Sequence, residues 1–279
     1  MKTAIALGTF DGVHTGHRAV LDKVLPFHSV AVTFSYPPKF YFTGSHELIM
    51  TPEDKCAALK KYGICEVDIR DFEQVKNLSA DEFLNEIYQK YHPVRIACGF
   101  NYRFGKNALG DTALIKDFCN KHGIEFCRTE CISENGVAVS STYIRELIAS
   151  GRIKEANRLI YGGFSFTGEV LHGDSRGHTL GFPTANLRYP KNLVKLKSGV
   201  YEVAVTVNGK SFKGISNIGL RPTFRTDTVM SETFIKDFDA DIYGKIITVK
   251  PLEFLREEKK FSSVEDLVKA VMRDINSIK

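Results

Sequence analysis

The chain has 279 residues, 43% hydrophobic and 25% charged, a composition typical of a globular protein with room for two domains. The net charge of +5 is spread evenly, with 20 basic and 19 acidic residues before Gly162 and 18 and 14 from there on. Neither half carries the basic stripe of a nucleic-acid-binding protein, and no apolar run is long enough for a signal peptide or transmembrane helix, so we expect a cytoplasmic protein.

The first predicted strand, Thr3 to Phe10, leads into a glycine-punctuated loop that opens a helix from Thr15 to Leu25, stopped by Pro26. His14 and His17 fall three residues apart, beside the unpaired backbone N–H groups of the first helical turn. Such a turn attracts anions, and two imidazoles add donors, so the loop predicts a phosphate site. The competing interpretation is a helix cap and a surface residue.

The rest of the first half alternates strands and helices. Strands are predicted at Ser29–Phe34, Cys65–Ile69, Val94–Cys98 and Ile124–Arg128, and helices at Thr51–Tyr62, Ser79–Tyr91 and Asp111–His122. This alternation indicates a parallel sheet covered on both faces. Ligands of such sheets lie beyond the carboxyl ends of the strands, where the loops Gly8–His17 and Gly99–Lys106 would meet. The six cysteines form no zinc pattern, and we expect reduced thiols.

The segment from Val139 to Arg145 predicts a second anion site. Ser140 or Ser141 is a good N-cap, which places Arg145 in the first turn, where a cation opposes the helix dipole. A bound anion would resolve this conflict, whereas the plainer interpretation is a capped helix with a solvated arginine. A further helix follows from Arg152, and we place the domain boundary near Tyr161, giving domains 1–161 and 162–279.

The second half is typical of an antiparallel β-barrel. Short alternating strands are predicted at Phe166–Leu171, Gly199–Val207, Ser211–Ser216, Val229–Phe238 and Ile246–Phe254. Asn208-Gly209 is a strong hairpin signal between two of them. A terminal helix capped at Ser262 or Ser263 carries one apolar face, formed by Val264, Leu267, Val268, Val271 and Ile275. We expect a small barrel with this helix packed against it.

The barrel carries its own candidate site. Thr184 and Asn186 are two apart on an extended segment, so their oxygens point to the same side and are suited to Mg²⁺ with ATP. Glu232 is a candidate general base toward a substrate hydroxyl. No P-loop occurs in the chain. Taken singly, the first two residues are more often turn formers and the glutamate more often a solvated strand residue.

Together these motifs resemble the bacterial bifunctional riboflavin kinase/FAD synthetase family over essentially the whole chain. The segments that carry the resemblance are Gly8–His17, Gly99–Gly105, Ser140–Arg145, Gly181–Asn186, Asn217–Phe224 and Leu255–Phe261. The resemblance implies a Rossmann-like nucleotidyltransferase domain with a parallel sheet, followed by a small antiparallel β-barrel with a C-terminal helix. It also implies two ATP- and Mg²⁺-dependent reactions, from riboflavin to FMN and from FMN to FAD with release of pyrophosphate.

The resemblance further implies roles for individual residues. In the first domain the implied ATP-binding and catalytic residues are Gly8, Phe10, His14, His17, Asn101, Ser141, Thr142 and Arg145. In the barrel the implied nucleotide-binding residues are Gly173, Gly181, Pro183, Thr184 and Asn186, of which Thr184 and Asn186 hold the metal and Glu232 activates the ribityl hydroxyl. The implied partners are riboflavin, FMN, FAD and ATP, with no nucleic acid or membrane, and the oligomeric state stays open.

The chain departs from the family pattern at three places. Tyr36-Pro37-Pro38 replaces the usual Pro-His-Pro after the second strand, so the histidine of that motif is missing. His178 replaces an arginine after Gly177, and Phe234 replaces a histidine two residues after the catalytic glutamate. The departures at His178 and Phe234 leave open an FMN adenylyltransferase with an inactive barrel. A second alternative is a protein that uses the barrel to bind nucleic acid, as small barrels do, although the even charge distribution argues against it.

Overall fold

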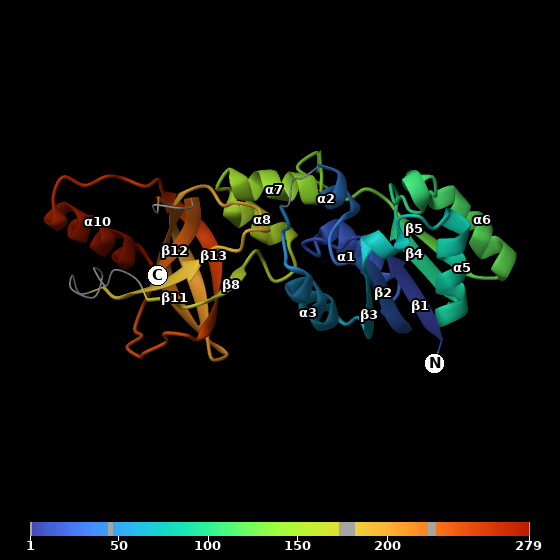
Figure 1. Cartoon of the computed structure of the whole chain (residues 1–279), viewed down its shortest axis with the longest axis horizontal. Coiled ribbons are helices and arrows are strands. Elements are labelled where there is room, and N and C mark those ends of the chain that lie inside the picture. Colours follow the sequence, from blue (N-terminus) through green and yellow to red (C-terminus); the bar gives the residue numbers. More distant parts are fainter. Residues whose placement is uncertain (1, 44–46, 173–181, 223–226, 279) are drawn as a thin grey trace. The chain divides into compact units, whose positions relative to one another are not determined.

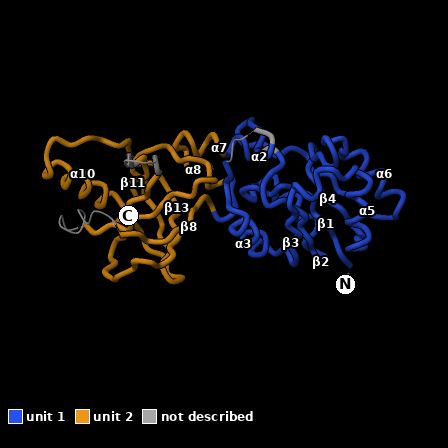
Figure 2. Tube along the Cα trace, in the orientation of Figure 1, with its two compact units in different colours: residues 1–144, 159–162 blue, residues 145–158, 163–279 orange. Residues whose placement is uncertain are grey.

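The computed structural model describes residues 2–43, 47–172, 182–222 and 227–278, and Figure 1 shows the course of the chain. The chain divides into two compact units (Figure 2). Unit 1 comprises Met1–Ile144 and Leu159–Gly162, and unit 2 comprises Arg145–Arg158 and Gly163–Lys279. The sequence boundary near Tyr161 assigns the segment Arg145–Arg158 to the first domain, whereas in the structure this segment belongs to the second unit.

Unit 1 is built on a parallel sheet, as predicted. Its strands are β1 (Thr3–Leu7), β2 (His28–Phe34), β3 (Glu66–Arg70), β4 (Arg95–Gly99) and β5 (Glu125–Thr129). They lie in the order β3-β2-β1-β4-β5, and every neighbouring pair is parallel. The strand order reverses between β1 and β4, where the register ends at Leu7 opposite Cys98. The loops that follow these two strands therefore leave the sheet side by side, which confirms the predicted meeting point.

The helices of unit 1 begin largely where capping residues predicted them. They are α1 (Thr15–Asp22), α2 (Pro38–Thr43), α3 (Pro52–Tyr62), α4 (Phe72–Val75), α5 (Ala80–Tyr91), the 3₁₀ turn η1 (Lys106–Ala108), α6 (Thr112–His122) and the start of α7 (Ser141–Ala149). Thr51 caps α3, and Ser79 with Glu82 forms a capping box on α5. The prediction for α1 was too long, because its C-cap is Lys23. The two-residue strands β6 (Ser133–Glu134) and β7 (Val137–Ala138) were missed.

Unit 2 is a six-stranded antiparallel barrel, which confirms the second fold prediction. Its strands are β8 (Phe166–Glu169), β9 (Thr184–Arg188), β10 (Gly199–Val207), β11 (Lys210–Pro222), β12 (Asp227–Ile235) and β13 (Ile246–Arg256). The order is β8-β13-β10-β11-β12-β9, so β8 and β9 are the two edge strands. Just after β8, the backbone amide of Leu171 donates to the carbonyl of Asn186 in β9 at 2.8 Å, which links these two edges. The barrel is thus nearly closed. Strand β9 was not among the predicted strands, and it carries two of the candidate site residues.

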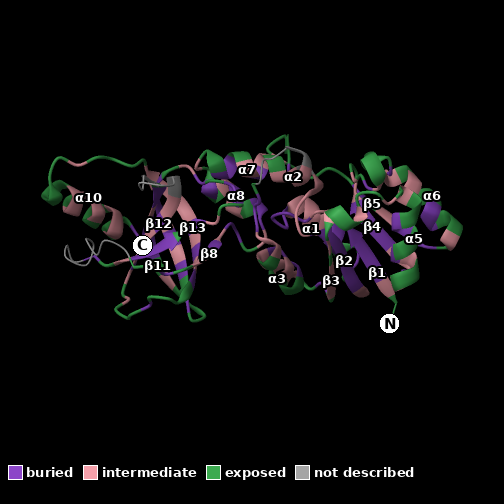
Figure 3. Ribbon diagram, in the orientation of Figure 1, coloured by how far each residue is buried: buried purple, intermediate pink, exposed green. Residues whose placement is uncertain are grey.

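Two helices accompany the barrel in unit 2. Helix α8 (Ile153–Leu159) contacts β13, because the side-chain amide (Nδ2) of Asn157 donates to the backbone carbonyl of Pro251 at 2.8 Å. Helix α10 (Val264–Ser277) begins after Ser263 as predicted. Ile275 of its apolar face packs against the barrel, and Leu267, Val268 and Val271 are partly buried, whereas Val264 in the first turn is 55% exposed. The expected packing of this helix against the barrel is confirmed at Ile275. Figure 3 shows buried strands and mixed exposure along this helix.

Candidate functional site

The loop after β1 has an unusual backbone that its surroundings hold in place. Phe10 and Val13 have positive φ angles of 49° and 39°, a region that residues other than glycine seldom occupy. Between them Gly12 adopts φ 86°. Gly8, at the start of the loop, donates its amide to the Val32 carbonyl at 3.2 Å. Strained backbone of this kind persists only where neighbouring groups determine it, and it clusters at functional sites.

Three polar side chains supply that support. The Asp11 carboxylate accepts hydrogen bonds from the backbone amides of Ile49 at 2.9 Å and Met50 at 3.2 Å. The Lys55 ammonium donates to the carbonyls of Thr9 at 3.3 Å and Phe34. The Ser141 hydroxyl, at the start of α7, donates to the Asp11 carbonyl at 3.1 Å. These contacts join the loop to β2, α3 and α7, and they fix the path of the chain into α1.

The two histidines come together at the N-terminus of α1. His14 is the N-cap, and its Nδ1 accepts the His17 amide at 3.3 Å. The two rings stack with centroids 3.6 Å apart, and the Phe10 ring meets His17 edge-on at 5.4 Å. A Cβ on Gly16 would lie 3.2 Å from the His14 ring, so this glycine leaves room for the imidazole. The arrangement gives a helix start with two imidazoles, as predicted.

Burial determines the charge of His17. Desolvation lowers the pKa of His17 well below 6.5, and the positive charges of His14 and Lys55 lower it further. Its Nδ1 is buried and has no hydrogen-bond partner. Burial likewise lowers the pKa of Lys55 to about 8, although Asp11 opposes that shift. At neutral pH the pair of imidazoles therefore includes a neutral His17 next to a charged ammonium.

Acidification should destabilise the protein through His17. The unfolded chain binds a proton on this histidine near pH 6.5 and the folded chain does not, so the free energy of unfolding falls as the pH drops below 6.5. For one such group the slope reaches about 1.4 kcal/mol per pH unit. Urea unfolding followed by circular dichroism at pH 7.5 and 5.0 should show a smaller acid loss for His17→Gln than for the unsubstituted chain. Equal losses would contradict the burial of a neutral imidazole.

Asp11 provides a second test of the loop. In Asp11→Ala the amides of Ile49 and Met50 lose their acceptor, and each unpaired buried N–H costs about 1–3 kcal/mol. Asp11→Asn keeps an oxygen at the same place and should lose less than half as much free energy of unfolding. Denaturant titrations of both variants measure this difference. If asparagine destabilises as much as alanine, the negative charge beside Lys55 matters more than the two hydrogen bonds.

The remaining candidates of the first domain lie on the neighbouring loop and on α7. Asn101 is exposed directly after β4, and the amide of Tyr102 turns back to the Gly99 carbonyl at 3.1 Å. The N-cap of α7 is Ser140, whose hydroxyl accepts the Tyr143 amide at 3.2 Å. Thr142 is exposed in the first turn. Arg145 is the fifth residue of α7, so the expected placement in the first turn was wrong, and its conflict with the helix dipole is weaker than predicted.

In the barrel, strand register brings the candidate residues together. Asn186 of β9 lies directly opposite Glu232 of β12, and Glu232 lies directly opposite Asn217 of β11. Directly opposite residues of antiparallel strands point to the same face, with Cβ atoms about 4.5–5.5 Å apart. Thr184 lies on this face as well, opposite Phe234. Asn186 is buried and Glu232 half-buried. The sequence had no means of locating Asn217 in this row.

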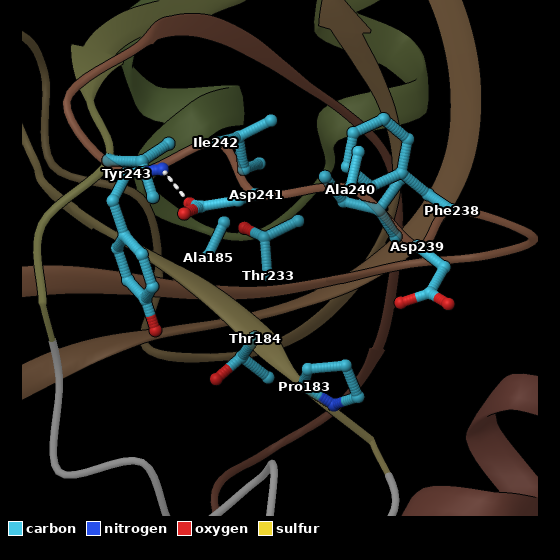
Figure 4. A pocket seen from close by; sticks show the side chains of 12 residues that line it. Pro183, Thr184, Ala185, Thr233, Phe238, Asp239, Ala240, Asp241, Ile242 and Tyr243 are labelled. Atoms are coloured by element: carbon cyan, nitrogen blue, oxygen red, sulfur yellow. Dashed lines mark hydrogen bonds between the residues drawn. The ribbon is translucent and has the colours of Figure 1, made fainter.

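A cavity of about 270 Å³ opens beside the N-terminal end of β9, where Thr184 lies (Figure 4). Pro183 and Thr184 line it on one side, and the segment around Asp241 and Tyr243 lines it on the other. The Tyr243 amide donates to the Asp241 carboxylate at 3.0 Å, and the Tyr243 ring stacks on His172 at 3.9 Å. Gly173, Gly181 and His178 lie outside the described residues.

Comparison with known proteins identifies both halves of the chain. A family model described as FAD synthetase matches residues 1–143, and one described as riboflavin kinase matches residues 162–279. Curated proteins named bifunctional riboflavin kinase/FMN adenylyltransferase are similar over nearly the whole chain. The one from Listeria monocytogenes is 34% identical, covering 98% of this chain and 90% of its own length, and the one from Haemophilus influenzae is 31% identical, covering 99% and 93%. The chain belongs to this bifunctional family.

Among solved structures, this chain is similar to one described as a macrolide-efflux protein from Streptococcus pneumoniae. The TM-score is 0.90 at 30% identity, with 99% of this chain and 93% of the other covered. The likeness extends through both units. In the stretches that the structure describes, none of the helices has the length and apolar content needed to cross a bilayer.

The donors around Asn186 fit a hard cation. The Asn186 Nδ2 donates to the Thr184 carbonyl at 3.3 Å, which leaves its Oδ1 as the atom that can meet a metal. With the Thr184 hydroxyl this makes a pair of neutral oxygens, which Mg²⁺ accepts when waters and phosphates complete its shell. Within the described ranges, no group of three or more His, Cys, Asp or Glu side chains is arranged to hold a metal by itself. This donor set therefore suits a metal that arrives with a nucleotide.

Sequence reasoning missed three residues that the structure places beside these candidates. Lys55 appears in the sequence as an ordinary helical lysine. Asp11 and Asn217 both stand in segments that carry the family resemblance, Gly8–His17 and Asn217–Phe224, but neither was given a role of its own. For Asp11 a further signal existed, because a carboxylate between Phe10 and Gly12 in a tight loop is a candidate to accept backbone amides.

Proposed function

We propose that this chain makes FAD from riboflavin in two steps, with residues 1–161 adenylylating FMN and residues 162–279 phosphorylating riboflavin. The supporting observation is that each half matches a different family model and carries its own set of site side chains. The two sets differ in kind. The first consists of a helix start with imidazoles, and the second of uncharged oxygens with one carboxylate.

In the adenylyltransferase domain the FMN phosphate attacks the α-phosphorus of ATP, and pyrophosphate leaves. The amides at the start of α1 and the imidazoles of His14 and His17 stabilise the charge on the phosphates. The neighbouring loop brings Asn101 to the same edge of the sheet. Ser141 anchors the loop, and Thr142 and Arg145 follow it on α7. Because nucleotidyl transfer needs positioning and charge stabilisation, this domain requires no nucleophile of its own.

In the kinase domain Glu232 takes the proton from the terminal ribityl hydroxyl as that oxygen attacks the γ-phosphorus of ATP, and ADP leaves. Thr184 and Asn186 hold Mg²⁺, which when bound neutralises charge on the phosphates. Pro183 and the cavity beside β9 receive the rest of the nucleotide. Gly173 and Gly181 belong to the same proposed nucleotide site.

All six cysteines are free thiols, which fits a reducing compartment and supports a cytoplasmic location.

A time course of riboflavin with excess Mg²⁺ and ATP, resolved by chromatography, tests the proposal. FMN should appear first and FAD later, with ADP and pyrophosphate as the other products. FAD formed from added FMN but no FMN formed from riboflavin would leave a monofunctional adenylyltransferase, with Phe234 as the first residue to exchange for histidine. Omission of Mg²⁺ should abolish both products.

A further inference from the structure

The face of the barrel that carries Thr184, Asn186 and Glu232 also carries a side-chain amide that the proposed mechanism does not use. Asn217 lies directly opposite Glu232 in the pairing of β11 with β12, so its side chain shares a face with that carboxylate and with Asn186 on the far side. The three side chains form a row across three adjacent strands. Asn217 is therefore next to the group that we propose as the general base.

A second carboxylate holds this amide. The Asn217 Nδ2 donates to Glu258 Oε1 at 3.1 Å. Glu258 follows β13 in the chain, and its carboxylate lies over Gly219, where a Cβ would be 2.3 Å from Oε1 and 2.9 Å from Oε2. The glycine thus leaves the space that the carboxylate occupies. Because a carboxylate only accepts hydrogen bonds, it fixes which end of the amide points toward it.

The other end of the amide is unsatisfied. Asn217 Oδ1 is buried and has no hydrogen-bond partner. A buried carbonyl oxygen without a donor is costly, so such an atom indicates a missing ligand group. The missing group must be a donor. The phosphate oxygens of a nucleotide are acceptors, whereas a polyol chain presents several hydroxyl donors.

We propose that Asn217, held by Glu258, accepts a hydrogen bond from a hydroxyl of the riboflavin side chain and so presents the reacting hydroxyl to Glu232. This inference depends on the proposed kinase function of the barrel. Asn217 contacts the substrate, and Glu258 is a positioning residue that acts through Asn217. Asn217 and Glu258 therefore position riboflavin, the phosphoryl acceptor, whereas Thr184 and Asn186 bind the metal and the nucleotide.

Steady-state kinetics of the full chain test the pair. Asn217→Ala should raise the KM for riboflavin about tenfold and lower kcat/KM about 100-fold, because both the contact and the alignment are lost. The KM for ATP and the rate of FAD formation from FMN should stay within about twofold. Ser211→Ala, an exposed change on the same strand, is the matched control and should leave all constants unchanged.

The Glu258 variants separate positioning from direct action. Glu258→Gln keeps an oxygen that accepts from the amide and should stay within about threefold of the unsubstituted chain. Glu258→Ala should resemble Asn217→Ala, and the double variant should be no worse than Asn217→Ala alone, since the two residues act as one unit. Because Glu258 is exposed, its variants also serve if Asn217→Ala fails to fold, as judged by circular dichroism.

Several outcomes would overturn the inference. A raised KM for ATP with an unchanged KM for riboflavin would assign Asn217 to the nucleotide. Glu258→Gln as impaired as Glu258→Ala would mean that the charge of Glu258 acts directly. Unchanged riboflavin kinetics in Asn217→Ala would remove its role but leave the kinase function intact. If the unsubstituted chain forms no FMN from riboflavin, the proposed function itself fails.

Discussion

Replacing His17 with alanine should lower kcat for FAD formation from FMN about 100- to 1,000-fold, the range found for the loss of one preorganised hydrogen-bond donor. The imidazole lies at the start of α1, stacked on His14 at 3.6 Å, where the helix amides already favour anions. In the free protein burial lowers the pKa of His17, and a bound triphosphate would raise it again by supplying opposite charge. The variant therefore loses a group that can gain a proton as the nucleotide binds.

The same variant should form FMN from riboflavin at a rate within about twofold of the unsubstituted chain, because that reaction is assigned to the other unit. His28→Ala is the matched control, since His28 begins β2 at the amino end of the strand and is partly exposed. Both products are measured chromatographically from the same preparation. Equal loss of FMN and FAD formation in a folded His17 variant would contradict two separate sites.

Replacing Glu232 with glutamine should produce the opposite result. Loss of a general base lowers the rate of a proton-transfer step about 100- to 10,000-fold, so FMN formation from riboflavin should fall by that factor. Glutamine keeps the size of the side chain opposite Asn186 and Asn217, and the barrel should stay intact. FAD formation from added FMN should be unaffected.

Glu169→Gln is the control for this second prediction, because Glu169 is an exposed strand carboxylate of the same barrel. The KM for ATP is expected to change little in Glu232→Gln, since Thr184 and Asn186 remain. A variant that retains more than about a tenth of the kinase rate would show that the hydroxyl loses its proton without this carboxylate, and the assignment of Glu232 would be wrong.

Local signals in the sequence were sufficient for much of the fold. The caps at Thr51, Ser79 and Ser263 all begin helices in the structure, because a side-chain acceptor for the first amides depends only on nearby residues. Asn208-Gly209 forms the expected turn, with φ angles of 48° and 77° that suit these two residues. The same signal at Asn135-Gly136 was overlooked, and strands β6 and β7 were missed with it.

Pairings between distant residues could not be obtained in this way. Asn186 and Glu232 are opposite only because β9 pairs with β12, and Asn217 joins them only because β11 lies on the other side. Lys55 reaches the loop after β1 because α3 packs beside it, and nothing in its own surroundings in the chain marks it as buried. Arg145 was predicted in the first turn of α7 but is the fifth residue of that helix, because two adjacent serines offered two N-caps and Ser140 is the one used.

The sequence by itself determined the kinds of element, the two-part organisation and the residues of the His14–His17 helix start, since each depends on groups within a few positions of one another. The tertiary structure alone decided which candidate groups lie side by side: strand order placed the loops after β1 and β4 next to each other, and strand register aligned Asn217, Glu232 and Asn186. The physical reason is that a one-residue slip in register turns every side chain of a strand to the opposite face. Burial, register and packing against distant segments together determine that alignment, and no short stretch of sequence contains them.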